Sequence, residues 1–306
     1  MIGVPQVGSA RREAAGALLV VSASALFGFV VVFGKLALRR GWPVTSMLAL
    51  RFGIGAAILA VALAVLRRPL VAASGERTVL VLLAVCGYAV EAALFFAALE
   101  HGTAAAVTLL FFTYPVLVML ASWAMGTGRP SKLTAFSLAL AGTGTAIVVA
   151  TGGRLSIERV GVLFALGSAV AYTLYLVGAD RLLRKTNPVT SSMWVSAGAS
   201  IGLAAYSLVS GVGQIPAGWG KWWPVLGMSA GTAGAFVCLL SGLERLGAVR
   251  TSVIAATEPL SSALLAYLFL NEAVTIGTAL GGALILTGAV AAALARTSRA
   301  AEPPIP

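Results

Sequence analysis

Four ionisable side chains stand inside long apolar stretches of this sequence: Glu91, Glu258, Arg51 and Lys35. An ionisable group in a hydrocarbon environment costs at least ~2.5–3.5 kcal/mol on membrane-insertion scales, so each of them requires a cavity, a partner or a function. The two carboxylates could hold an ammonium group or exchange a proton. Arg51 and Lys35 could pair with a carboxylate or recognise an anion.

Glu91 shares one face of a helix with Tyr88 and Phe95, since the three residues follow an i, i+3, i+7 spacing. A carboxylate in an aromatic-walled cavity is suited to the ammonium group of an amino acid or amine. A second interpretation stays open. Charges inside a membrane usually pair, so Glu91 could instead form a permanent ion pair with Arg51 or Lys35 that positions helices.

Glu258 directly precedes Pro259, whose missing N–H leaves a backbone carbonyl without its helical partner and tends to kink the helix. A carboxylate beside a kink is suited to gating or coupling. The alternative is a glutamate bonded to backbone donors in a discontinuous helix. Pro115 follows Tyr114 in the same way, and we predict that both prolines are hinge points.

The elements that position these residues are membrane-spanning helices. Hydrophobic residues make up 59% of the 306 residues and charged residues only 10%, whereas soluble domains carry about 25% charged residues. Runs of about 20 apolar residues, enough to cross a hydrocarbon core about 30 Å thick, recur along the chain. We predict spans at residues 14–38, 44–66, 78–99, 104–125, 133–150, 160–182, 189–211, 222–243, 249–270 and 275–295.

The second half of the sequence repeats the first at a nearly constant offset. The matches include Leu99-Glu100 with Leu243-Glu244, Thr113-Tyr114-Pro115 with Thr257-Glu258-Pro259, and Pro43-Val44-Thr45 with Pro188-Val189-Thr190. The predicted fold is an all-α integral membrane protein with ten transmembrane helices, as two five-helix repeats over residues 14–150 and 160–295. Because five is odd, the second repeat enters the membrane from the opposite side. Such inverted repeats often place a binding site near the midplane.

Aromatic residues stand at related positions of the two repeats. Tyr172 and Tyr175 fall on one side of their predicted helix, and Phe27 is the first-half equivalent of Tyr172. We predict that these three residues, with Tyr88 and Tyr114, line a central cavity. Plain helix packing is the alternative for such aromatic residues at helical spacing.

Basic residues cluster at the ends of the predicted spans. Most of the 21 lysines and arginines fall on the side of the N-terminus, although Arg39-Arg40 run against this bias. The positive-inside rule therefore predicts that both termini are cytoplasmic, in a multi-pass protein of the plasma (inner) membrane whose lipid bilayer is its first partner. The basic residues form no aromatic-interleaved patch, so no nucleic acid partner is predicted.

Two groups of short motifs resemble the EamA family of the drug/metabolite transporter superfamily. Leu26-Phe27-Gly28, Lys35, Pro43 and Leu50-Arg51-Phe52 look like the family's "W-G … K … P … lRf" pattern, and Glu258-Pro259, Leu270-Asn271-Glu272 and Gly288 are similar to its "EP … lgE … G". The resemblance runs from about Ala14 to Ala295. Phe27 stands where the family more often has Trp, and Glu272 is expected at a helix end rather than on a substrate. The resemblance implies transport of small molecules, often export of amino acids or other metabolites.

We therefore predict a secondary transporter, and an exporter, of small metabolites such as amino acids that works by alternating access, with a proton as a candidate coupling ion. No P-loop, H-E-x-x-H, G-x-S-x-G or CxxC motif with supporting context is visible, so we predict neither an enzyme nor a cofactor. Cys86 and Cys238 lie inside apolar runs and predict no metal site. Two alternatives remain: a membrane-embedded enzyme acting on a lipid-linked substrate, and a scaffold or sensor without cargo.

Overall fold

The computed structural model describes residues 7–125, 157–211, 213–272 and 275–300, with a few residues between 132 and 147. Within these ranges every regular element is a helix, and one isolated antiparallel bridge pairs Gly102 with Ile157. The predicted all-α class therefore holds for the described residues. The fifth predicted span, residues 133–150, lies largely outside them.

Five long helices form most of the body: α1 (Val7–Arg39), α2 (Val44–Val65), α8 (Arg159–Leu182), α9 (Pro188–Val209) and α10 (Trp223–Ile254). Seven helical segments among the described residues are long and apolar enough to cross a membrane. They are Arg11–Arg39, Val44–Val65, Arg77–Glu100, Ala104–Ala124, Arg159–Leu182, Pro188–Val209 and Trp219–Ser252.

The difference from the predicted ten has local causes. The fifth span is described only at a few residues, and the ninth is broken, which leaves α11 (Glu258–Leu270) with 13 residues. The tenth corresponds to α12 (Ile276–Ala300), a helix of 25 residues whose side chains are described only in part. A stretch of 13 residues is shorter than the ~17–25 residues that usually cross a bilayer.

Three of the predicted spans are not continuous α-helices. The third consists of α3 (Arg77–Leu82), the π-helix η1 (Leu83–Tyr88) and α4 (Ala89–Glu100). The fourth consists of α5 (Ala104–Phe111) and α6 (Tyr114–Ala124), and the ninth of the end of α10, the 3-10 turn η4 (Ala255–Thr257) and α11. Gly247, with φ 74°, marks the bend inside α10 where the eighth and ninth predicted spans meet.

The breaks in the fourth and ninth spans come just before the two prolines. Pro115 and Pro259 lie in the first turns of α6 and α11, where a missing N–H costs nothing because that group has no intrahelical partner. The irregularity predicted at Pro259 is present as a break, in which the 3-10 turn η4 separates α10 from α11. The same break occurs at matching positions of both halves, which places Tyr114 and Glu258 each at the first residue of a helix.

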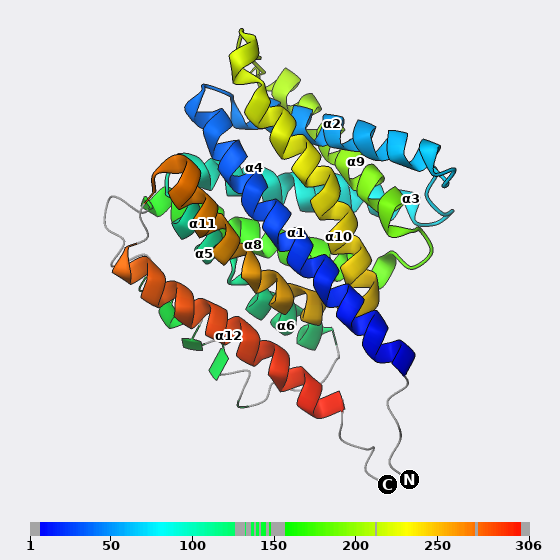
Figure 1. The fold of residues 1–306 in the computed structure, drawn as a ribbon, viewed down its shortest axis with the longest axis vertical. Coiled ribbons are helices and arrows are strands. Elements are labelled where there is room, and N and C mark those ends of the chain that lie inside the picture. Colours follow the sequence, from blue (N-terminus) through cyan, green and yellow to red (C-terminus); the bar gives the residue numbers. More distant parts are fainter. Residues whose placement is uncertain are drawn as a thin grey trace.

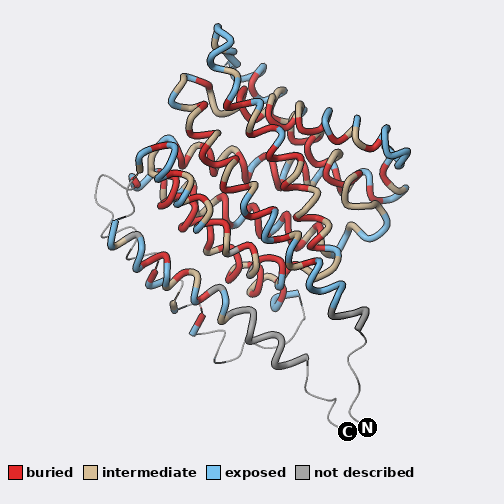
Figure 2. The backbone as a smooth tube through the Cα atoms, in the orientation of Figure 1, coloured by how far each residue is buried: buried red, intermediate tan, exposed pale blue. Residues whose placement is uncertain are grey.

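Helices of the first half pack mainly on helices of the second. The most extensive contacts join α1 to α10, α2 to α9 and α4 to α8, and α1 also packs on α11. Figure 1 shows α1 and α10 running side by side through the centre of the molecule. Buried residues concentrate where the helices meet (Figure 2), whereas Leu163, Leu208 and Leu264 face outward. Apolar side chains on the outer faces suit contact with lipid.

Candidate functional site

A cavity with an empty volume of about 390 Å³ lies between the two halves. The first half contributes residues from α1, α2, η1, α4 and α5, and the second from α8 and α11. The lining residues are Phe27, Val30, Val31, Arg51, Tyr88, Glu91, Ala92, Phe95, Phe96, Phe111, Tyr172 and Glu258. Half of the lining residues are aromatic, and three carry a charge.

The π-helix η1 comes directly before the cavity residues of α4. Tyr88 ends η1, and Glu91 and Phe95 follow in α4, so all three reach the cavity from one side as their spacing predicts. Short π-helical segments inside α-helices are frequently found at functional sites. Here the segment places an aromatic hydroxyl and a carboxylate on the same wall.

Glu91 is buried, with 6% of its surface exposed. Its carboxylate accepts a hydrogen bond from Ser168 Oγ on α8, at 3.3 Å. Among the described residues, no lysine or arginine nitrogen lies within 4.0 Å of it. The permanent ion pair with Arg51 or Lys35, one of the two interpretations of the sequence, is therefore not formed in this structure.

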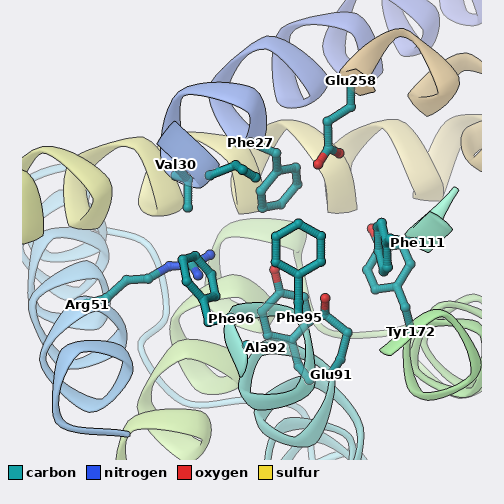
Figure 3. A pocket seen from close by; sticks show the side chains of 12 residues that line it. Phe27, Val30, Arg51, Glu91, Ala92, Phe95, Phe96, Phe111, Tyr172 and Glu258 are labelled. Carbon is teal, nitrogen blue, oxygen red and sulfur yellow. The ribbon is translucent and has the colours of Figure 1, made fainter. Parts of the chain in front are cut away.

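Glu258 is the first residue of α11 and is 8% exposed. Figure 3 shows its carboxylate pointing toward Phe27 and the cavity, across from the carboxylate of Glu91. No hydrogen bond joins it to another described residue, so the alternative interpretation, a glutamate bonded to backbone donors, is not seen within the described chain. A carboxylate in the first turn of a helix is favoured by the helix dipole.

Arg51 reaches the cavity from α2 and is 2% exposed. Its Nε donates to Thr232 Oγ1 at 2.6 Å, and the guanidinium lies over the rings of Phe52 and Phe96, at 4.6 and 5.4 Å. It interacts electrostatically with both cavity carboxylates but is further than 4.0 Å from them. The aromatic faces and one hydroxyl hold the charge beside the cavity without neutralising it.

Aromatic rings close the rest of the cavity wall. Tyr172 packs on Phe111 with ring centres 5.2 Å apart, and Phe27 packs edge-on against Phe236 at 6.2 Å. Two predicted wall residues stand one layer back: Tyr175 packs on Tyr88 at 5.0 Å, and Tyr114 packs on Tyr172 at 4.7 Å. Neither Tyr114 nor Tyr175 lines the cavity itself.

The sequence comparisons agree with this architecture. The family model described as "EamA-like transporter family" matches the chain twice, over residues 14–150 and 159–294. The chain belongs to the EamA-like transporter family. The two matches are also two copies of one repeat, in line with the repeated motifs of the sequence. This EamA-like protein is therefore an all-α, multi-pass membrane protein of a transporter family.

Relatives of this EamA-like protein are named as transporters. It is 28% identical over 279 residues to an "Uncharacterized transporter" of Archaeoglobus fulgidus, covering 90% of this chain and 96% of the relative. It is 30% identical to one of Synechocystis over 175 residues, 54% of this chain and about half (51%) of that relative. The "Uncharacterized inner membrane transporter YicL" of Salmonella typhimurium is 27% identical, over 67% of this chain and 69% of YicL.

A solved crystal structure shares the fold of this EamA-like protein. It superposes with a TM-score of 0.60 over 92% of this chain and 99% of that chain, at 24% sequence identity. At that identity the likeness concerns the fold alone.

Lys35 does not reach the cavity of this EamA-like protein. Its Nζ lies 3.1 Å from Glu272 Oε1, and it also donates to the backbone oxygen of Gly102. Lys35 is thus a pairing residue, as one interpretation had it, but its partner is Glu272 rather than Glu91. Glu272 follows the end of α11 and accepts a hydrogen bond from Ala104, the first residue of α5. It is therefore a helix-end residue, as expected from the sequence.

Some cavity residues were missed in the sequence. Phe96, Phe111, Val31 and Ala92 line the cavity, and Ser168 and Thr232 hold its charged groups. Phe96 is adjacent to Phe95, and adjacent positions normally point to different helix faces. Small hydroxyl residues inside apolar runs were the available signal for Ser168 and Thr232. Among the described residues, no cluster of three or more His, Cys, Asp or Glu side chains could hold a metal.

Proposed function

We propose that this EamA-like protein is a secondary transporter that exports small amphipathic metabolites, with amino acids as the first class to test. The observation that carries the proposal is the cavity between the repeats, in which Glu91 of the first repeat faces Glu258 of the second. Both carboxylates are buried, and neither has a cationic partner within 4.0 Å among the described residues. A buried charge without a partner is costly in free energy unless a ligand pairs with it or a proton neutralises it.

Recognition of an amino acid would use all three charges. The ammonium group lies between Glu91 and Glu258, and the carboxylate faces the guanidinium of Arg51. Arg51 forms no ion pair within 4.0 Å with either glutamate among the described residues, so all three charges remain available to a zwitterion. Phe27, Tyr88 and Tyr172 contact the apolar part of the cargo, with Tyr114 and Tyr175 supporting them from behind.

Transport proceeds by alternating access between two inverted five-helix repeats, residues 14–150 and 160–295, which together span the membrane ten times. Because each repeat supplies part of the cavity wall, a movement of one repeat against the other changes which side of the membrane the cavity reaches. The helix breaks before Pro115 and Pro259 act as hinges, since chain that is not α-helical absorbs backbone rotation more readily than a continuous helix.

A proton is the coupling ion. With both glutamates ionised and Arg51 protonated, the cavity carries one net negative charge, which a bound zwitterion does not remove. A proton on Glu258 or Glu91 removes it, so an inward proton movement can alternate with outward cargo movement. The positive-inside bias favours cytoplasmic termini, and the inner-membrane relative supports a plasma-membrane location.

The test is counterflow of a panel of labelled amino acids and amines in proteoliposomes, with and without a pH gradient. The variants are Glu91→Gln and Glu258→Gln, with Glu244→Gln as the matched control, since that glutamate is largely exposed outside the cavity. We expect parent and control to carry at least one compound. Each cavity variant should lose counterflow, or its response to the pH gradient. Unchanged flux in both cavity variants would reject the proposed roles of the glutamates.

A further inference from the structure

The carboxylate of Glu272 joins three separate parts of the chain at one end of the bundle. Its Oε1 pairs with Lys35 Nζ at 3.1 Å and with Arg39 at 3.0 Å, both on α1. Its Oε2 accepts a hydrogen bond at 2.9 Å from the backbone N–H of Ala104, the first residue of α5. One side chain of the second repeat thus holds two elements of the first.

The turn at the end of α11 positions Glu272 beside Lys35, Arg39 and Ala104. Asn271 adopts the left-handed conformation with φ 56°, and the N–H of Glu272 bonds back to Ala266 O. A left-handed residue directly after a helix, with backbone N–H groups bonded back to the last turn, ends the helix and turns the chain sharply. Arg39 also donates to Leu270 O at 3.2 Å. The turn is therefore pinned to α1 through backbone as well as side chain.

This contact lies directly beyond the cavity. Lys35 follows the cavity residue Val31 by four positions, about 6 Å along the helix axis at 1.5 Å per residue. Between them, Gly34 packs against the ring of Phe96, another cavity residue. Lys35 also donates to Gly102 O, in the connection between α4 and α5. Figure 1 shows the C-terminal end of α11 beside the upper half of α1.

We propose that Lys35, Arg39 and Glu272 form a latch that closes the cavity on the membrane side where α1 ends, and that the latch opens whenever the cavity is exposed to that side. The inference rests on the proposed transport cycle and names a gating residue, Glu272, that the cavity does not contain. In the present structure the latch is closed, because Glu272 contacts Lys35, Arg39 and the backbone N–H of Ala104 at once.

The two cations contribute unequally. Lys35 and Glu272 are buried, with side chains 11% and 9% exposed, whereas the Arg39 side chain is 47% exposed. An exposed ion pair contributes little because water and salt screen it. Removal of one member of a buried pair leaves the other charge uncompensated, which favours any state in which that charge reaches water. Loss of Glu272 therefore favours the state opened on this side.

The experiment measures cavity access from each side without any cargo. Val31→Cys, in a background with Cys86→Ser and Cys238→Ala, reports access through its labelling by a charged, membrane-impermeant maleimide in right-side-out and inside-out vesicles. We expect Glu272→Gln to raise the labelling rate about fivefold or more from the side where α1 ends, and not from the other, as a shift in population requires. Arg39→Gln should raise it less.

Two further variants separate the latch from a general loss of structure. Lys35→Met removes the other member of the Lys35–Glu272 pair. It therefore tests the latch even if the Glu272→Gln protein does not accumulate in the membrane. The exchange Lys35→Glu with Glu272→Lys should return the labelling rate toward the parent value. Unchanged labelling in both single variants, or an equal rise from both sides, would overturn the proposal. Because no cargo is used, failure here is distinct from failure of the counterflow test.

Discussion

Glu91 on α4 and Ser168 on α8 meet across the boundary between the two repeats, with Ser168 Oγ 3.3 Å from Glu91 Oε1. This hydrogen bond is the only one that the structure gives to the Glu91 carboxylate within the described chain. A neutral hydroxyl orients the carboxylate without neutralising it, so its charge stays available to a ligand. The contact also makes the geometry of the cavity depend on how the repeats lie against each other.

Ser168→Ala removes this orienting contact and keeps the charge. We expect the KM for transported cargo to rise about fivefold, since a hydrogen bond of this kind contributes about 1 kcal/mol. The maximal rate should change less. Initial-rate counterflow at several cargo concentrations measures both quantities.

Thr173→Ala is the matched control for Ser168→Ala. Thr173 is also buried on α8, but its hydroxyl donates to Ala169 O within the same helix and it does not line the cavity. An equal rise in KM for both variants would show that Ser168 acts through the helix rather than through Glu91.

Gly34→Ala should overpack the wall behind the cavity. A Cβ at this position would lie 2.0 Å from Phe96 Cε1, so the ring would have to move. Overpacking of a buried contact costs about 1–3 kcal/mol, and we expect a lower melting temperature together with weaker cargo binding. Thermal unfolding in detergent and a binding assay measure the two effects.

Two comparisons sharpen that prediction. Gly220→Ala places a Cβ with nothing within 4 Å and should change neither quantity. Gly34→Ala combined with Phe96→Leu should regain part of the lost stability, because the smaller side chain can give way. A double variant no more stable than Gly34→Ala would show that the clash with Phe96 is not the cause.

Glu76 forms a second link between the repeats, at the connection between α8 and α9. Its carboxylate accepts hydrogen bonds from the backbone N–H groups of Arg184, Lys185 and Thr186, at 2.8, 2.7 and 2.8 Å. Burial raises the pKa of Glu76, but hydrogen bonds from Thr186 and from these amides outweigh it, so the pKa lies below its usual value. Glu76→Gln should lower the free energy of unfolding by about 1–3 kcal/mol at pH 7.

The effect of Glu76 depends on pH with a definite sign. Because its pKa is lower in the folded state, Glu76 stabilises the fold above its unfolded-state pKa of about 4.3. This contribution is lost as the pH falls through the folded-state pKa. The melting temperatures of parent and Glu76→Gln should therefore differ at pH 7 and converge in acid. Glu100→Gln, at an exposed position, should behave like the parent, and a difference that persists in acid would contradict the explanation.

The sequence predicted much of the cavity because helical spacing is a strong signal inside a membrane. Glu91, Tyr88 and Phe95 share a face at i, i+3, i+7, and all three line the cavity. Glu258 and Arg51 were found through the cost of charge in an apolar run. The repeat then indicated that residues of both halves come together.

Other structural features could not be predicted from the neighbouring sequence. Lys35 looked like a cavity charge, but its partner Glu272 is more than 200 positions away, at a helix end that only tertiary packing brings near. The π-helix before Glu91 follows from packing rather than from a distinctive composition, since Leu83–Tyr88 reads as an ordinary apolar segment. Pro259 signalled an irregularity, but not that α10 would end and α11 begin there.

The most direct test of the central claim is equilibrium binding of a compound identified by counterflow. Its dissociation constant would be measured for the purified parent, Glu91→Gln, Glu258→Gln and the control Glu244→Gln. If the cavity between the repeats is the substrate site, each cavity variant should bind about tenfold more weakly or worse, as loss of a buried charged contact implies, and the control should match the parent. Parent-like affinity in both cavity variants, for a compound that the protein carries, would place the site elsewhere and contradict the account.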